Sequence, residues 1–156
     1  MAADYPTMST AEIRSAYLNF FEERGNKLYA SSSLVPDDPS LLLANAGMNQ
    51  FKEYYQGKKV MKEIGACSCQ KCVRTNDIDI IGSDGRHASF FEMLGNFAFG
   101  GVTKEQACTW AYELITEVFK LPKERLHFTV FTDDDETHDV WRALGVPEDH
   151  ITRLGE

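Results

Sequence analysis

The chain has 156 residues, of which 43% are hydrophobic and 12% are aromatic. That is enough to bury one sizeable core, so the composition excludes a disordered chain, and a single domain over residues 1–156 is expected. The formal charge of −8 and the pI near 5.0 exclude a global basic field that would attract a polyanion.

A helix is predicted near the N-terminus, over about residues 10–24. Ser9 and Glu12 have the spacing of a capping box, in which each side chain bonds the backbone N–H of the other residue. Apolar residues recur at helical spacing behind this box, and Gly25 is typical of a helix end. The apolar positions are Ile13, Tyr17, Phe20 and Phe21.

The segment after this helix is predicted to be extended at first and then to turn. Residues 27–31 are interpreted as extended, and Pro36 and Pro39, with two acidic residues between them, mark a turn. Residues 41–44, LLLA, are predicted to form a buried strand. In residues 51–65 several lysines surround little apolar surface, which predicts a short amphipathic helix and a mobile connection.

An antiparallel hairpin is predicted next, and it carries the most informative residues of the chain. Strands at about 70–74 and 87–94 flank a polar loop. Arg74 ends the first strand, Arg86 and His87 lie where the second begins, and paired phenylalanines follow. An arginine can hold a phosphate through two hydrogen bonds, and an aromatic ring can stack on a base. This layout predicts a nucleotide site that handles ATP.

The C-terminal third is predicted to alternate helices and strands. Thr103 begins a second capping box, and the clearest amphipathic helix pattern of the chain runs from there to Phe119. Residues 126–130 alternate as a strand, a helix follows at about 135–144, and residues 151–154 form a last strand with no assigned partner. This order predicts an α+β fold, in which an antiparallel or mixed sheet has helices to one side.

A cytoplasmic location without membrane contact is expected. No apolar run of ~18 residues is present that would span a bilayer. The first residues, MAADYPTMST, lack the basic and apolar regions of a signal peptide. In the cytoplasm the four cysteines would be reduced thiols.

Two residue clusters raise the question of a bound metal. Cys67, Cys69 and Cys72 form a C-x-C-x-x-C pattern that would hold zinc if His87 were a fourth ligand. A second Cys or His cluster at ligand spacing is absent, so protein-bound zinc is not expected. The acidic run 133–136 offers oxygen ligands for Mg²⁺, but a solvated turn ahead of a helix is the simpler interpretation.

Several stretches, taken in chain order, carry a resemblance to a known family. They are SSSLVP at 31–36, LLLANAGMNQFK at 41–52, QKCVR at 70–74 and RHASFFEMLGNFAFG at 86–100. With these motifs the chain resembles the N-terminal part of the alanyl-tRNA synthetases, a family of class II aminoacyl-tRNA synthetases. The resemblance implies part of an adenylation domain, whose substrates are alanine and ATP with Mg²⁺ and whose product is alanyl-adenylate for the charging of tRNA(Ala).

The resemblance also implies roles for the residues of the hairpin. Arg74 matches the arginine of the second class II motif, which grips the α-phosphate of ATP and stabilises charge as pyrophosphate leaves. Arg86 or His87 would contact the γ-phosphate. Phe90 is preferred as the ring that stacks on adenine because of its spacing from Arg86, and Phe91 would then point to the opposite face. Without the resemblance, Arg74 would be interpreted as a surface cation and the Arg-His pair as a solvated turn.

A pocket for the amino acid is implied in the same way. Glu92 and Met93 would line its adenine and amino acid end, although a solvent-facing carboxylate and a core methionine are the ordinary alternatives. Asn45, Gly47 and Asn49 would shape the pocket through close backbone approach and amide hydrogen bonds. For these three residues the alternative is a tight turn after a strand.

Departures from the family leave two hypotheses open. Gly101-Val102-Thr103-Lys104 stands where the family has Asp-Tyr-Phe-Lys, and the third class II motif and the acidic residue that holds the amino group of alanine are missing. Weak nucleotide binding is therefore expected. The chain is either a synthetase segment that binds ATP and activates alanine, with tRNA(Ala) bound only if the missing regions are supplied, or a free-standing regulatory module without aminoacylation activity. Such a module would form a homo- or hetero-oligomer through an exposed sheet edge.

Overall fold

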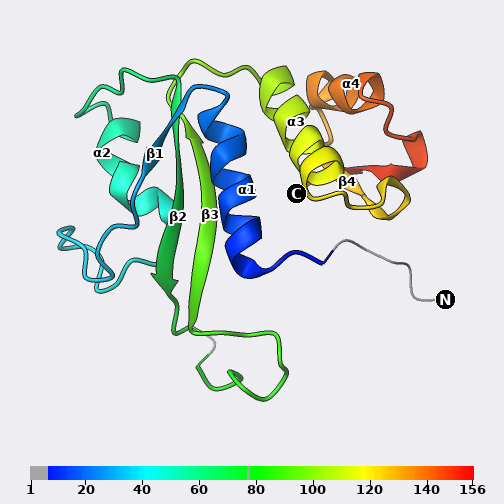
Figure 1. Cartoon of the computed structure of the whole chain (residues 1–156). Coiled ribbons are helices and arrows are strands. Elements are labelled where there is room, and N and C mark those ends of the chain that lie inside the picture. Colours follow the sequence, from blue (N-terminus) through cyan, green and yellow to red (C-terminus); the bar gives the residue numbers. More distant parts are fainter. Residues whose placement is uncertain (1–6, 77) are drawn as a thin grey trace. The chain divides into compact units, whose positions relative to one another are not determined.

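The computed structural model describes residues 7–76 and 78–156, and the chain divides into two compact units (Figure 1). The first, here called the sheet unit, is Arg14–Gly101. The second, the C-terminal unit, joins the residues up to Ile13 with Val102–Glu156. The structure contains both helices and strands, so the predicted α+β class is confirmed. The single domain expected over residues 1–156 stays a prediction. Among the described residues no helix is both long and apolar enough to cross a bilayer.

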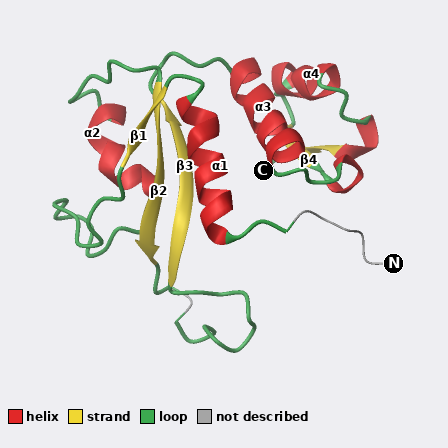
Figure 2. Cartoon of the chain, viewed as in Figure 1, coloured by secondary structure: helices red, strands yellow, loops and turns green. Residues whose placement is uncertain are grey.

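A mixed three-stranded sheet forms the centre of the sheet unit (Figure 2). Its strands, in spatial order, are β1 (Asn26–Tyr29), β2 (Gly65–Val73) and β3 (Phe90–Ala98). β1 runs parallel to β2, and β2 runs antiparallel to β3, so the predicted mixed sheet and its hairpin are confirmed. β2 begins before the first predicted strand and β3 ends after the second, because the added segments GACSC and GNFA consist mostly of small residues without clear alternation; β3 begins at Phe90 and not at residue 87.

Helix α1 (Thr10–Glu22) begins at the predicted capping box. The Ser9 N–H donates to Glu12 Oε2 over 2.7 Å, and the Glu12 N–H donates to Ser9 Oγ over 3.3 Å. The Ser9 hydroxyl, 2.6 Å from the same carboxylate, also lowers the pKa of Glu12. The helix ends before Gly25, whose φ of +83° favours glycine. The buried residues of α1 are Phe20 and Phe21.

The alternation of side chains along β2 and β3 gives the sheet two faces with different cover. The α1 face packs on α1, where Cys67 Sγ lies 3.9 Å from the Leu18 carbonyl oxygen. The other, the η1 face, lies against the 3₁₀ helix η1 (Gly47–Phe51), whose first N–H donates to Met93 Sδ over 3.2 Å. The short predicted helix follows as α2 (Lys52–Tyr55). Figure 2 shows α1 and α2 on opposite sides of the strands, which differs from the expectation that the helices lie to one side of the sheet. The η1 face carries Ala66, Ser68, Gln70 and Cys72 of β2, and Phe91, Met93, Gly95 and Phe97 of β3.

An aromatic core fills the space between η1 and the sheet. Phe51 is 1% exposed, and its ring centroid lies 4.8 Å from that of Phe97 and 5.1 Å from that of Tyr29. The ring of Phe97 folds back over Gly95, so that a Cβ added there would lie 2.5 Å from two of its ring atoms. Gly95 therefore provides the space that lets Phe97 reach Phe51.

The predicted buried strand at residues 41–44 is wrong, because that segment forms a bend with exposed leucines. Leu42 is 92% exposed, whereas Ala44 is buried. The Ala44 N–H donates to the Leu34 carbonyl over 2.8 Å, and the Val73 N–H donates to the Ala44 carbonyl over 2.9 Å. This bond to the end of β2 anchors Ala44 alone. An apolar run by itself therefore misled the prediction.

The C-terminal unit contains a second, two-stranded sheet with helices. Its elements are α3 (Lys104–Glu113), a π-helical turn (Leu114–Val118), 3₁₀ turns (Lys123–Arg125 and Glu148–His150), β4 (Phe128–Phe131), α4 (Asp135–Ala143) and β5 (Ile151–Leu154). The strand with no assigned partner is β5, which in fact pairs in parallel with β4. The helix predicted from Thr103 is confirmed, and its cap bond from the Gln106 N–H is 3.2 Å. The core of this unit contains Val130, Trp141 and Val146.

The acidic run 133–136 forms the start of α4, in agreement with the simpler interpretation. Asp134 Oδ1 accepts the Thr137 N–H over 3.1 Å and lies 3.0 Å from Lys104 Nζ. The Lys104 bond and then the Thr137 bonds lower the pKa of Asp134 to about 2. This carboxylate is therefore engaged in capping the helix and pairing with the lysine.

Gly95→Ala is expected to lower the free energy of unfolding by about 1–3 kcal/mol, because the new methyl group would overlap the Phe97 ring. Urea unfolding and the hydrogen-exchange protection of the β2–β3 amides measure the loss. Ser68→Ala is the matched control, since Ser68 lies opposite Gly95 and its buried hydroxyl has no hydrogen-bond partner among the described residues. Equal stability of Gly95→Ala and the parent would show that the ring does not need the glycine.

The cap of α4 predicts a pH dependence of stability. The pKa of Asp134 is depressed in the folded chain, so its contribution is complete above the ordinary value of 3.8 and is lost as the pH falls toward about 2. Asp134→Asn should flatten the decline of the urea midpoint over this range, followed by tryptophan fluorescence. Asp133→Asn removes the same charge one residue earlier and should keep the parent slope. An unchanged slope in Asp134→Asn would contradict the assignment.

Candidate functional site

Arg74 follows the last residue of β2 and is held over the η1 face of the sheet. Its backbone N–H donates to the Ser89 carbonyl over 2.9 Å, which continues the hairpin ladder. Its Nε donates to the Asn45 carbonyl over 2.9 Å, and its guanidinium carbon lies 5.2 Å from the centroid of the Phe91 ring. Within residues 7–76 and 78–156 its two terminal nitrogens have no hydrogen-bond or ion-pair partner. A fixed guanidinium with two such nitrogens can bind an anion.

One predicted pocket residue contacts this arginine, and two others follow it in the chain. Asn45 supplies the carbonyl for Arg74, and the Asn49 side-chain amide donates to the Asn45 side-chain oxygen over 3.1 Å. Gly47 is buried against Met93, and a Cβ added at Gly47 would lie 3.1 Å from the Phe97 ring. The expected close backbone approach at this glycine is therefore observed.

The two phenylalanines at the start of β3 point to opposite faces of the sheet, as expected from the alternation along a strand. Phe91 lies opposite Cys72 in the ladder and under Arg74. Phe90 lies opposite Val73, is 52% exposed, and belongs to the α1 face. Phe91 therefore shares the face of Arg74 and Phe90 does not, which spacing from the loop could not reveal; which ring binds a base stays a prediction.

Glu92 also lies on the α1 face and not beside Arg74. Its Oε2 accepts hydrogen bonds from Arg14 Nη2 over 2.6 Å and from Arg14 Nε over 3.2 Å. The Arg14 bond lowers the pKa of Glu92. This carboxylate therefore ties the first turns of α1 to β3, on the face of the sheet opposite to Met93.

Arg86 and His87 lie in the exposed loop between β2 and β3. Asp84 Oδ1 accepts the backbone N–H of Arg86 over 2.9 Å and that of His87 over 3.1 Å, and its Oδ2 lies 2.5 Å from His87 Nδ1. The backbone bond from Arg86 is the first cause of the lowered pKa of Asp84. Among the described contacts, none joins either side chain to Arg74 or Met93. Asp84 orders this turn, while the Arg86 side chain stays in solvent.

The cysteine pattern does not converge on one point. Cys67 and Cys69 lie on the α1 face, whereas Cys72 lies on the η1 face, because positions of opposite parity point to opposite sides. Within the described parts of the chain, no three Cys, His, Asp or Glu side chains are placed to share a metal ion. Burial raises the pKa of Cys67 to about 11, so that residue is a protonated thiol at neutral pH.

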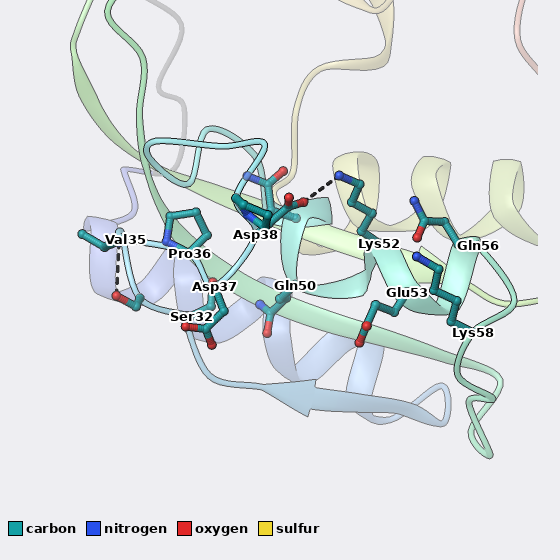
Figure 3. A pocket seen from close by; sticks show the side chains of 13 residues that line it. Ser32, Val35, Pro36, Asp37, Asp38, Gln50, Lys52, Glu53, Gln56 and Lys58 are labelled. Atoms are coloured by element: carbon teal, nitrogen blue, oxygen red, sulfur yellow. Dashed lines mark hydrogen bonds and ion pairs between the residues drawn. The ribbon is translucent and has the colours of Figure 1, made fainter.

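A cavity of about 530 Å³ lies beside η1, and the sequence did not indicate it (Figure 3). It is enclosed by the loop 32–39 and by residues of the segment 49–58. Lys52 Nζ bonds Asp38 Oδ2 over 2.6 Å at its wall, and this bond is the first cause that holds the pKa of Asp38 well below its usual range. No local pattern pairs these two residues, so only the fold brings them together.

The charge of the chain is unevenly divided between the two units. Residues 14–101 contain ten Lys and Arg and ten Asp and Glu, so the formal charge of −8 belongs wholly to the other residues. The unit that carries Arg74 is therefore neutral overall. An anion that approaches Arg74 meets no net repulsion from that unit.

Comparison with known proteins identifies relatives over nearly the whole chain. The family described as tRNA synthetases class II (A) matches residues 12–156. The alanine–tRNA ligase of Fervidobacterium nodosum is 49% identical over 149 residues, which are 96% of this chain and 17% of the relative. The chloroplastic/mitochondrial alanine–tRNA ligase of Oryza sativa subsp. indica is 51% identical over 156 residues, 99% of this chain and 16% of the relative.

A third relative, the alanine–tRNA ligase of Synechocystis sp., is 49% identical over 99% of this chain and 18% of its own length. The chain therefore spans less than a fifth of the length of these curated relatives. It is homologous to part of their catalytic region, which confirms the resemblance carried by the sequence motifs. On this evidence the chain belongs to the class II (A) family of tRNA synthetases.

Proposed function

We propose that this chain forms the part of an ATP site that holds the α-phosphate and the adenine, for the activation of alanine. The guanidinium of Arg74 carries the proposal, because it is fixed through Nε while its terminal nitrogens face no partner in the described residues. Homology to alanine–tRNA ligases supports the choice of amino acid. In the proposed reaction a carboxylate oxygen of alanine attacks the α-phosphorus of ATP, alanyl-adenylate forms and pyrophosphate leaves.

Arg74 would act by charge stabilisation. Negative charge grows on the phosphate oxygens as the bond to pyrophosphate breaks, and a donor that is already in place stabilises it without reorganisation. The Asn45 carbonyl occupies Nε, so the two terminal nitrogens remain for two phosphate oxygens. No side-chain nucleophile is needed, since positioning and charge account for this chemistry.

Phe91 takes the place of Phe90 in this proposal as the ring that stacks on adenine. Its ring lies on the same face as Arg74, with 5.2 Å between its centroid and the guanidinium carbon. One nucleotide could therefore reach both groups, with a phosphate at the arginine and its base at the ring. Stacking of a base on an aromatic side chain contributes ~1–3 kcal/mol.

Asn45, Gly47 and Met93 are proposed as the wall of the amino acid pocket. The close contact of the Gly47 N–H with Met93 Sδ, at 3.2 Å, leaves little depth beneath the wall. A shallow wall suits a side chain as small as the methyl group of alanine. Arg86 or His87 would contact the γ-phosphate from the loop, and Mg²⁺ would arrive with ATP.

The steps that follow the formation of alanyl-adenylate are proposed to need regions beyond the residues of this chain. The relatives are several times longer, and transfer of the alanyl group to tRNA(Ala) is assigned to this chain only together with such further regions. The location of the protein stays a prediction, since the relatives include a chloroplastic/mitochondrial ligase.

A second candidate function is a binding or regulatory module without aminoacylation activity. The observation that favours it is the sheet order β1-β2-β3, in which β3 pairs only with β2 among the described strands. The other edge of β3 would accept a strand from a second copy or from another chain. Alanine-dependent ATP–pyrophosphate exchange separates the two functions, because only the first predicts it.

Arg74→Ala is expected to weaken ATP binding roughly 10- to 100-fold, since a hydrogen-bonded charge pair contributes about 1.5–3 kcal/mol. It should also abolish any ATP–pyrophosphate exchange. Arg74→Lys should recover only part of the affinity, because an ammonium group lacks the guanidinium fork. An NMR titration with ATP suits weak binding, and Lys71→Ala, which removes an exposed cation from the same strand, is the control. Equal ATP affinity of Arg74→Ala and Lys71→Ala would refute the role of Arg74.

Phe91→Ala is expected to weaken the binding of adenosine by roughly 5- to 100-fold, whereas Phe90→Ala should leave it nearly unchanged. The physical reason is the face of each ring, since only Phe91 shares the η1 face with Arg74. Titration of both variants with adenosine, which has no phosphate, isolates the contribution of the base. The reverse order of effects would restore the original assignment of Phe90.

A further inference from the structure

Gln70 is a wholly buried amide in the middle of β2, with 0% of its surface exposed. Its Oε1 accepts hydrogen bonds from the Ser32 N–H at 2.8 Å, the Ser32 hydroxyl at 3.0 Å and Gln50 Nε2 at 3.1 Å. Its Nε2 donates to the Ser32 carbonyl at 3.2 Å and to the Lys71 carbonyl at 2.8 Å. The donors and acceptors of this amide are thus fully used. They join the sheet to two segments that are distant in sequence.

One of these segments is η1, the 3₁₀ helix that packs on the candidate site. Short 3₁₀ helices have poor internal hydrogen-bond geometry and rely on outside contacts. Gln50 lies within η1 and is hydrogen-bonded to Gln70. Gly47, at the start of η1, contacts Met93, and a Cβ added at Gly47 would lie 3.6 Å from the Gln70 Cβ. Gln70 therefore fixes the position of η1 on the sheet.

The contact chain continues from η1 to the phosphate-binding arginine. The residues just before η1 include Asn45, whose carbonyl accepts the Arg74 Nε–H over 2.9 Å. This carbonyl is the only hydrogen-bond acceptor of the Arg74 side chain within the described residues. A shift of η1 on the sheet would carry the carbonyl with it and release the guanidinium.

We propose that Gln70 is a positioning residue for Arg74, which acts through η1 and the Asn45 carbonyl. The inference rests on the proposed function in so far as Arg74 binds phosphate, whereas the contact chain itself exists without a nucleotide. Gln70 touches no substrate in this scheme, so it is not a catalytic residue. Its loss should impair the binding of phosphate and spare the binding of the base.

Gln70→Met is the main test variant, because methionine keeps the length and apolar stem of glutamine and removes all five hydrogen bonds. Ser68→Ala is the matched control, since Ser68 is equally buried, lies two residues earlier on the same face, and has no hydrogen-bond partner for its hydroxyl in the described structure. Gln70→Glu retains the oxygen that accepts the bonds from Ser32 and Gln50, so this variant should keep part of the behaviour of the parent chain. If Gln70→Met fails to fold, it is replaced by Gln50→Met, which removes the bond from η1 to Gln70 and a 3.4 Å bond to the Ala30 carbonyl and leaves the Ser32 bonds of Gln70 in place.

The first readout needs no nucleotide. The bond to the Asn45 carbonyl should slow the exchange of the Arg74 Nε–H proton with water, and NMR follows this exchange. In Gln70→Met or Gln50→Met the exchange should become at least about tenfold faster, as for the opening of a local hydrogen bond. In Ser68→Ala it should match the parent. Unchanged exchange in both test variants would overturn the inference.

The second readout is a double-mutant cycle on ATP affinity. If Gln70 acts through Arg74, then Arg74→Ala should cost at least about threefold less in the Gln70→Met background than in the parent. Adenosine affinity should be the same in Gln70→Met and the parent. Additive effects, or an equal loss of adenosine and ATP binding, would show a general packing role and reject positioning.

The two proposals can fail separately. A parent chain that binds neither ATP nor adenosine would refute the proposed function, and the Arg74 Nε–H exchange alone would then decide whether Gln70 positions the arginine. If the parent chain binds ATP but the two substitutions have additive effects in the double-mutant cycle, the proposed function stands and the inference about Gln70 is refuted.

Discussion

The antiparallel ladder between β2 and β3 is the constraint on which the sheet unit depends. Its pairs run from Gly65 opposite Ala98 to Val73 opposite Phe90. Because side chains alternate along each strand, this register assigns every residue either to the α1 face or to the η1 face, and a slip of one position would exchange the two sets. The grouping of Arg74 with Phe91 is a consequence of that register. Motif spacing alone locates the hairpin but does not reveal which phenylalanine shares the face of Arg74.

Close approach of η1 to the sheet is the second requirement, and it is met by small residues and one buried amide. Gly47 and Gly95 remove the side chains that would hold η1 and the Phe97 ring away from the strands. Such a tight junction buries backbone polar groups, and each one left without a partner would cost about 1–3 kcal/mol. Gln70 meets that need through its bonds to Ser32 and to η1. Packing and polar satisfaction therefore act together to hold the backbone that contacts the arginine.

Homology and geometry answer different questions about this chain. The relatives establish the family over nearly all of the chain but less than a fifth of their own length. The geometry shows which family-like residues are brought together in that part. Arg74, Met93 and Gly47 lie on one face, whereas Glu92 is paired with Arg14 on the other. A charge-neutral sheet unit is compatible with an anionic ligand at Arg74, although the whole chain is acidic.

Features that depend on near neighbours in the chain follow from the local sequence. The capping box at Ser9, the start of α4 at the acidic run and the hairpin whose first strand leads into Arg74 were all predicted, because caps, periodicity and turns act over a few residues. The leucine bend at 41–44, the pairing of β5 with β4 and the face that each of Phe90 and Phe91 occupies became known only from the tertiary structure. In each case the outcome depended on a partner distant in sequence. The alternation of side chains along a strand means that neighbouring residues point to opposite faces of the sheet, but only packing decides which residue points to which face.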